Sequence, residues 1–228
     1  MLGLYVTVPI ACFRPGAARE FWETLPLPPP STVYGFLLSM VGETDRTRHL
    51  GVRCTAGVIG QPDRSTVLRR MWRIKEFDPQ KGKTPGNGAN VRPDYQQLLT
   101  NVRIVMFVDS AEERNDDPTL EQRIMQSLNP LTRNRIERFG GLSLGESTYM
   151  VDEVCLLEKV TDQKTNEARL FLLADDGRMT LPVWVDHVGA AGTRFQTGSL
   201  TTLGENFPSR DRVPQIDDGN LSPLATTN

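Results

Sequence analysis

The sequence contains few of the residues on which metal sites and acid–base catalysis most often depend. It has two histidines and three cysteines in 228 residues. His49 and His187 do not lie at metal-ligand spacing with cysteine or aspartate, which argues against a zinc site. Cys12, Cys54 and Cys155 are odd in number and widely spaced, so they fit neither a disulfide framework nor a CxxC site. We therefore expect no metal, no cofactor and a reducing cytoplasm, with His49 on the surface and His187 at a strand end.

Long hydrophobic runs are also missing. No apolar stretch approaches the roughly 20 residues that a membrane helix needs, so no membrane partner is expected. The N-terminal stretch MLGLYVTVPIACFRPG is apolar, but it lacks a basic n-region and is interrupted by Pro9 and Arg14, which favours a strand over a signal peptide. A chain of this length can bury a sizeable core, as one large domain or one domain with a small appendage.

Positive charge is scarce overall but concentrated in one segment. The net charge of -2 and the pI near 5.8 argue against nucleic-acid binding only if the charges are evenly spread. Residues 64–92 carry eight basic and two acidic side chains, a local net charge of +6, so the remainder carries -8. The sequence therefore predicts one basic surface on an otherwise acidic protein.

Hydrophobic spacing predicts an α+β fold. A helix is expected from the cap Ser31 to Gly42, although Gly35 in its interior costs roughly 1 kcal/mol unless packing or a ligand requires it. A second helix is expected from Asp117–Pro118 to Pro130. Strands are expected at 2–11, 51–60, 66–77 and 101–108, with 51–60 pairing with 66–77, a β-rich region at 149–185 with a hairpin turn at 174–177, and a loose tail from 207. This order resembles a ferredoxin-like split βαβ unit enlarged by a basic hairpin.

The segment STVLRRMWRIKEF, residues 65–77, mixes cations with aromatic side chains. Single-stranded nucleic acid suits this mixture, because cations meet phosphates while aromatic rings stack on bases. Alternation along a strand places Trp72 beside Ile74, so Trp72 either stacks on a base or belongs to the core. The charges either bind phosphate or protect a solvated edge strand. The candidate RNA-binding residues here are Arg69, Arg70, Trp72, Arg73 and Lys75.

The next segment extends this basic surface. Lys81 and Lys83 lie in QKGKTPGNGAN, a stretch without apolar periodicity that is typical of a hairpin tip. In RPDYQQLL, Arg92 could contact phosphate and Tyr95 could stack on a base. Alternatively, Asp94 caps a helical turn and Tyr95 anchors the loop.

A glycine cluster lies in ERFGGLSLGES, residues 137–147. Gly140, Gly141 and Gly145 follow Arg138, and closely spaced glycines let backbone N–H groups approach a phosphate. A tight turn before a strand explains the same pattern. GLSLG also satisfies the GxSxG pattern around Ser143, with Asp152 and His187 as legal triad partners, but a charged segment precedes it and a strand-like one follows. A serine hydrolase is thus the second alternative.

Three of these motifs resemble one protein family. PPPSTVYGFLLSMVGE (28–43), the basic segment running into RPDYQQLL (69–99), and RFGGLSLGES (138–147) together are similar to the fifth CRISPR-associated protein family of type I Cascade complexes. The resemblance implies a RAMP-type, ferredoxin-like (RRM-type) RNA-binding domain at 1–160, with a thumb inserted at about 64–99. It also implies a small β-rich C-terminal portion at 161–228 with a loose polar tail.

The resemblance further implies a non-catalytic role in RNA-guided DNA targeting. The chain would cap one end of the Cascade backbone and clasp the 5′ handle of crRNA, with Tyr34, Arg138, Gly140 and Gly141 lining the handle site. The thumb, Arg69 to Arg92, would contact the backbone subunit of the seventh Cas family, and the chain would also touch the large subunit and, through the complex, target DNA.

The first alternative is a metal-independent endoribonuclease. Relatives of the I-C subtype cut precursor crRNA with a tyrosine and an adjacent lysine–histidine pair. No Lys–His pair occurs in this sequence, and Tyr34 has no neighbouring acid or base in the chain. We therefore expect no catalytic residue.

Overall fold

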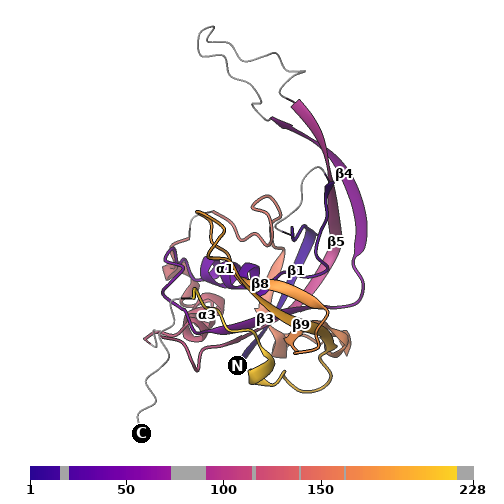
Figure 1. Cartoon of the computed structure of the whole chain (residues 1–228). Coiled ribbons are helices and arrows are strands. Elements are labelled where there is room, and N and C mark those ends of the chain that lie inside the picture. Colours follow the sequence, from indigo (N-terminus) through magenta and orange to yellow (C-terminus); the bar gives the residue numbers. More distant parts are fainter. Residues whose placement is uncertain (16–20, 73–90, 115–116, 139, 162, 220–228) are drawn as a thin grey trace.

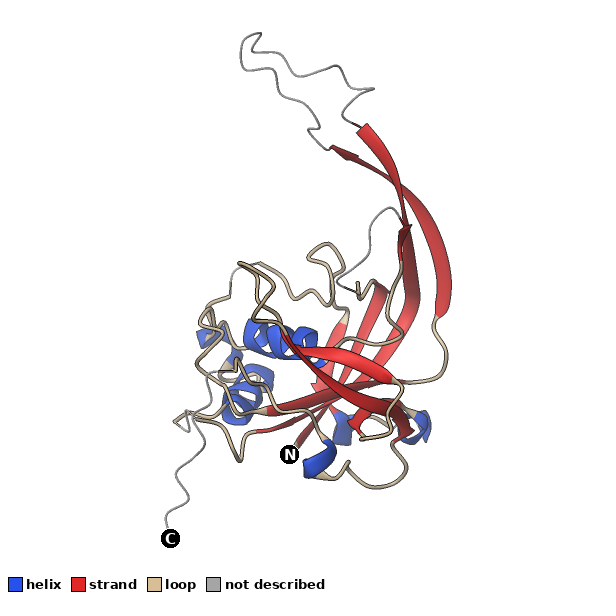
Figure 2. Ribbon diagram, in the orientation of Figure 1, coloured by secondary structure: helices blue, strands red, loops and turns tan. Residues whose placement is uncertain are grey.

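The computed structural model describes residues 1–15, 21–72, 91–114, 117–138, 140–161 and 163–219. Its centre is a nine-stranded sheet, with helices α1 and α3 side by side on one face (Figures 1 and 2). The strands are β1 Leu2–Ala11, β2 Phe21–Trp22, β3 Arg53–Val58, β4 Asp63–Trp72, β5 Val91–Asp109, β6 Glu153–Leu156, β7 Arg169–Leu173, β8 Met179–Trp184 and β9 Arg194–Thr202. The helices are α1 Pro30–Met40 and α3 Leu120–Leu128, with 3-10 turns at Arg133–Arg135, Leu157–Lys159, Gln163–Glu167 and Arg210–Arg212.

The main path of the sheet runs in the order β6-β1-β5-β3-β7-β9-β8, and its pairings are antiparallel. β1 forms at the predicted residues and is buried on both faces, as a central strand requires. Its Leu4 and Val6 pack with the helices, whereas Tyr5 packs with Phe107 and Val213 on the opposite face. The core therefore lies on both sides of β1 and β5.

β5 is the longest strand and organises the basic hairpin. Its first half pairs with β4, from Trp72 opposite Val91 to Asp63 opposite Thr100, and its second half pairs with β3. β3 and β4 thus follow each other along one edge of β5. The expected pairing between these two strands is wrong, because 19 residues of β5 are long enough to pair with both in succession. The β4–β5 ribbon leaves the body and curves away from it (Figure 1).

The C-terminal strands continue the same sheet beyond β3. The turn predicted at residues 174–177 is present, with Gly177 N–H donating to the Ala174 carbonyl at 3.0 Å. The strands that it joins do not form a hairpin, however, because β9 lies between β7 and β8. The sheet therefore passes across residue 160 without interruption, and the division at that residue stays a prediction.

The segment after Phe207 is packed rather than loose, as far as residue 219. Ile216 N–H donates to the Val52 carbonyl at 2.8 Å, and its own carbonyl accepts from Gly51 N–H at 2.9 Å. Val213 and Ile216 are fully buried. The prediction of a loose tail is wrong here, because two apolar side chains spaced three residues apart anchor an otherwise polar segment.

The cap of helix α1 lies two residues before the predicted one, at Pro29 instead of Ser31. Pro29 occupies the N-cap position and Pro30 the first turn, where the missing N–H and the fixed φ of proline cost nothing. Ser31 is therefore inside the helix. The helix ends at Met40, followed by Gly42 at φ 67°, where a side chain would meet the Glu137 carbonyl. The second helix begins with a capping box between Thr119 and Gln122 rather than at Asp117.

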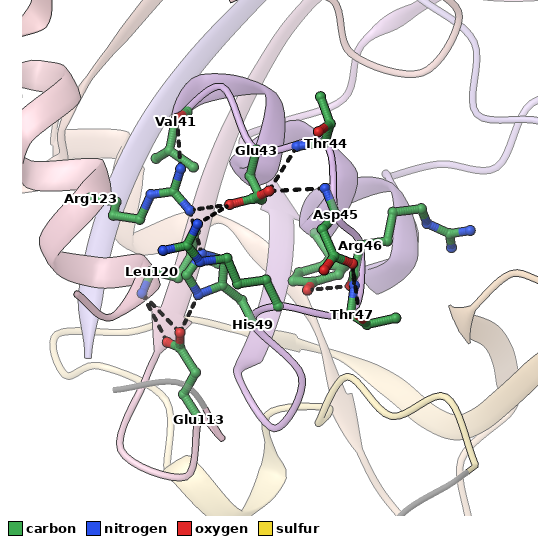
Figure 3. A network of polar contacts seen from close by, with 12 residues as sticks. Val41, Glu43, Thr44, Asp45, Arg46, Thr47, His49, Glu113, Leu120 and Arg123 are labelled. Carbon is green, nitrogen blue, oxygen red and sulfur yellow. Dashed lines mark hydrogen bonds and ion pairs between the residues drawn. The ribbon is translucent and has the colours of Figure 1, made fainter. Parts of the chain in front are cut away.

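A buried polar network ties α1 to α3 (Figure 3). His49 is fully buried and contacts Glu113 through Nδ1, while Arg123 lies 2.7 Å from its Nε2. Glu113 also accepts from Leu120 N–H, at the start of α3, at 2.9 Å. Arg123 reaches Glu43 at 2.5 Å. The expectation that His49 lies on the surface is wrong, because its two partners, Glu113 and Arg123, are distant in the chain.

Candidate nucleic-acid interface

A cleft of about 790 Å³ opens beside the β4–β5 hairpin. Six chain segments line it: the residues after β1, β2, the start of α1, β4, the loop after Gly141 and the residues after β8. Its lining residues are Cys12, Phe13, Arg14, Pro15, Trp22, Thr32, Arg69, Gly145, Glu146, Ser147, Thr148, Val185 and His187. We call this hollow the cleft.

Two arginines converge on one indole ring in the cleft. The guanidinium carbon of Arg14 lies 4.7 Å from the centre of the Trp22 ring, and that of Arg69 lies 5.9 Å from it. Their side chains keep 47% and 32% of their surface exposed, so both remain accessible to an anion. The cleft therefore combines cations with a large aromatic ring, which is the chemistry that single-stranded nucleic acid requires.

Glu146 holds these arginines in position. Its Oε1 lies 3.1 Å from Arg14 Nε, and its Oε2 lies 3.1 Å from Arg69 Nη1. Gln96, which is fully buried, donates to Glu146 at 2.9 Å and accepts from Arg69. Counting these three charges, the cleft keeps one net positive charge in an arrangement that is already ordered before a ligand arrives.

The opposite face of the same strands carries an apolar row. Phe21 of β2 lies opposite Tyr95 of β5, and Tyr95 lies opposite Leu68 of β4. Their exposed fractions are 44%, 52% and 59%. We call these three residues the outer row; its two aromatic rings are accessible for stacking.

The structure places the predicted hairpin residues as follows. Arg69 lies in the cleft and Tyr95 in the outer row. Tyr95 and Asp94 belong to a strand, so the alternative of a helical turn capped by Asp94 is wrong. Arg70, Trp72 and Arg92 lie on β4 and β5, but their side chains are outside the described part of the structure, as are Arg73, Lys75, Lys81 and Lys83 altogether.

Tyr34 is not accessible to RNA in this structure. It lies on α1 with 2% of its surface exposed, and its hydroxyl donates to the Arg46 carbonyl at 2.8 Å. Burial raises the pKa of this phenol above its usual value. We therefore correct the expectation that Tyr34 lines the handle site, because α1 buries this position together with most of its other side chains.

The glycine segment lies beside the cleft. Gly140 and Gly145 have φ values of 79° and 90°, and a side chain at Gly145 would meet the Cys12 carbonyl at 2.5 Å. Arg138, Gly140 and Gly141 are exposed. The missing side chain of Gly145 therefore lets this backbone approach the Cys12 carbonyl closely, which brings the next residue, Glu146, to Arg14.

The surroundings of Ser143 do not form a nucleophile elbow. Ser143 makes an isolated antiparallel bridge with Met150, with no helix after it, and it does not line the cleft. The elbow requires a strand before the serine and a helix after it. Burial also raises the pKa of the Cys12 thiol, which disfavours a thiolate nucleophile in the cleft.

Sequence reasoning did not assign Arg14, Trp22 or Glu146 to the site, and it considered His187 only as a triad partner or strand-end residue. They come from segments distant in the chain, and no local pattern links them.

The described residues contain no cluster of three or more histidine, cysteine, aspartate or glutamate side chains that could hold a metal. Among them, too, no helix has the length and apolar character needed to cross a membrane.

Comparison with known proteins identifies the family. No family model matches the sequence. A CRISPR-associated protein Cas5 of Myxococcus xanthus (strain DK1622) is 45% identical over 216 residues, covering 95% of this chain and 97% of that protein. Two solved structures share the fold: a CRISPR RNA-guided surveillance complex chain (TM-score 0.57, 14% identity, 92% and 95% coverage) and a Cas protein (TM-score 0.51, 15% identity, 94% and 97% coverage). The chain therefore belongs to the Cas5 family of CRISPR-associated proteins.

Proposed function

We propose that this chain is a non-catalytic RNA-binding subunit of a type I CRISPR Cascade complex in the cytoplasm. It grips the 5′ handle of crRNA and caps the backbone of the complex for RNA-guided DNA targeting. The observation that carries this proposal is the convergence of Arg14 and Arg69 on Trp22 in the cleft, in a chain of the Cas5 family.

The proposed RNA site consists of the cleft and the surfaces next to it. Arg14 and Arg69 contact phosphates, and Trp22 and Tyr95 are positioned on opposite faces of the ribbon for stacking. Arg138, Gly140 and Gly141 extend the site along the glycine segment. Arg70, Trp72, Arg73, Lys75, Lys81, Lys83 and Arg92 complete it on the hairpin.

The topology supports a ferredoxin-like core. The units β1, α1, β3, β5, α3 and β6 follow the order strand, helix, strand, strand, helix, strand, and their sheet order is β6-β1-β5-β3. The β4–β5 ribbon is then an insertion between the second and third strands of this core. We infer that it is the thumb, and that it contacts the backbone subunit of the seventh Cas family, with the large subunit and target DNA contacted elsewhere in the complex.

Direct binding tests this function. The purified protein is titrated against labelled 5′-handle RNA derived from the repeat and against a scrambled RNA, by fluorescence anisotropy across a range of salt concentrations. Handle-preferring binding that weakens with salt is expected, because phosphate contacts release counterions. Denaturing gels of the same samples show intact RNA; cleavage would instead favour the endoribonuclease.

A matched pair of variants locates the site. Arg69→Ala removes a cation from the cleft and should weaken handle binding roughly tenfold, since one charged hydrogen bond contributes about 1.5 kcal/mol. Arg178→Ala removes an exposed arginine from the turn before β8 and should leave the affinity unchanged. Equal affinities of both variants and the unmodified protein would contradict a site in the cleft.

A further inference from the structure

A second group of arginines lies outside the cleft, in the loop after α3. We call residues 129–138 the arginine loop. Arg133, Arg135 and Arg138 are all exposed, and Glu137 is the one acidic residue of the loop. Within the part of the chain that the structure describes, none of the three arginines makes an ion pair. The loop therefore carries a net charge of +2.

The backbone of the arginine loop is fixed. Thr132 Oγ1 donates to the Gln126 carbonyl of α3 at 2.6 Å, and Arg133 N–H donates to the Asn129 carbonyl at 2.9 Å. The Glu137 carbonyl lies directly against Gly42, at the end of α1. Because the loop backbone is anchored to both helices, ordering this backbone adds little to the entropic cost of binding a ligand.

Helix α1 connects this loop to the cleft. Thr32, in the first turn of α1, lines the cleft, whereas Val41 and Gly42 share a hollow of about 340 Å³ with Arg135. Nine residues separate Thr32 from Val41, and the helical rise of 1.5 Å per residue places the two sites about 14 Å apart. This distance is short enough for one strand of RNA to reach both.

The exposed side of α1 leaves this route open. Thr32 and Ser39 are half-buried and Gly35 is exposed, so this side of α1 itself carries no charged side chain. A side chain added at Gly35 would meet no atom within 4 Å, so no packing contact in the protein requires glycine at this position. The arginines, not these small residues, supply the attraction.

We propose that the arginine loop is a second anion-binding surface, which holds phosphates of the RNA segment continuous with the one in the cleft. This inference rests on the proposed function. Arg133 and Arg135 contact phosphates, which fix the path of the strand without reading its bases. The bound RNA then follows α1 from its first turn to its last, in addition to following the hairpin.

The test uses an Arg133→Ala/Arg135→Ala double variant and a series of labelled handle RNAs shortened one nucleotide at a time from each end. The variant should bind the shortest RNAs like the unmodified protein, but it should lose about a hundredfold in affinity for the longer ones, because two phosphate contacts of about tenfold each are removed. For these, the slope of log K against log salt should fall by about 1.4, or 0.7 for each lost phosphate contact on a single strand. Lys159→Ala/Arg178→Ala removes the same charge from exposed positions and should change neither quantity.

The outcomes separate the two proposals. Failure of the unmodified protein to bind any RNA would overturn the proposed function and this inference with it. Normal binding of every RNA length by the Arg133→Ala/Arg135→Ala variant would overturn the inference alone. If that variant binds RNA normally but no longer joins the assembled complex, the arginine loop contacts a protein, and the inference is likewise overturned. Thermal melting checks that the variant is folded.

Discussion

Two arginine–carboxylate groups of this protein have opposite surroundings. In the buried network, Arg123 keeps 15% of its side chain exposed and reaches Glu43, His49 and the Val41 carbonyl. In the cleft, Arg14 and Arg69 share Glu146 and keep a third to a half of their surface in solvent. The buried arginine–carboxylate pair therefore connects two helices, whereas the solvent-accessible one positions its arginines for an anion.

The largest effect is expected from breaking the enclosed network. Glu113→Ala removes the acceptor of the Leu120 N–H and of His49, leaving two buried polar groups without partners. We expect a loss of about 3–4 kcal/mol in the free energy of unfolding, measured by urea denaturation. RNA affinity per folded molecule should not change.

The neighbouring carboxylate provides the control for this loss. Glu112 pairs with Arg53 at 3.0 Å, but its side chain is 42% exposed. Glu112→Ala should cost less than about 1 kcal/mol, because exposed ion pairs contribute little. Equal losses for the two variants would show that burial of the network does not determine its strength.

Acidification is a second way to open the network. Burial alone would raise the pKa of Glu43, but Arg123, the Asp45 N–H and Arg48 lower it to about 2. Because this pKa is lower in the folded state, the carboxylate stabilises the fold above its unfolded pKa of about 4.5. That stabilisation is lost as the pH falls toward 2. A Glu43→Gln variant should be less stable than the unmodified protein at pH 7, by about 2–3 kcal/mol, and the difference should shrink below pH 4.

In the cleft and the outer row, the contributions of stacking and of charge to RNA affinity can be measured separately. Tyr95→Ala should weaken handle binding by roughly 1–3 kcal/mol, the contribution of one base–aromatic stack, without changing the salt slope. Arg69→Ala should lower both the affinity for the handle and the salt slope. Phe195→Ala, an exposed aromatic residue of β9, is the matched control. A change of salt slope with Tyr95→Ala would contradict stacking.

The smallest effect concerns Gly35 on α1. Alanine at this position meets no atom within 4 Å and favours the helix, so Gly35→Ala should raise the free energy of unfolding by about 0.5–1 kcal/mol. Chemical denaturation measures this gain. A loss of stability would show that the glycine is required by the fold of the free protein.

Local patterns predicted the core of this fold well. The alternation of residues 2–11 defined β1, and the apolar spacing from Val33 to Val41 identified α1. The family resemblance was confirmed by the Cas5 relative. These features are encoded in neighbouring residues, so the sequence alone was sufficient to detect them.

Pairings across long distances could not be predicted in this way. The position of β9 between β7 and β8, and the contact of Ile216 with Val52, depend on segments far apart in the chain. Part of the candidate site could not be predicted for the same reason. Arg69 was identified from local charge, but its partner Glu146 is 77 residues away. His49 was misplaced because its buried partners come from other segments.

The continuous sheet also determines when the chain can finish folding during synthesis. β3 emerges from the ribosome more than a hundred residues before β7, the strand that pairs with its outer edge at Gly57 and Val58. Until then, that edge has unpaired backbone groups that can bind other strands. A chain truncated before residue 169 would therefore keep this edge open and be prone to aggregation.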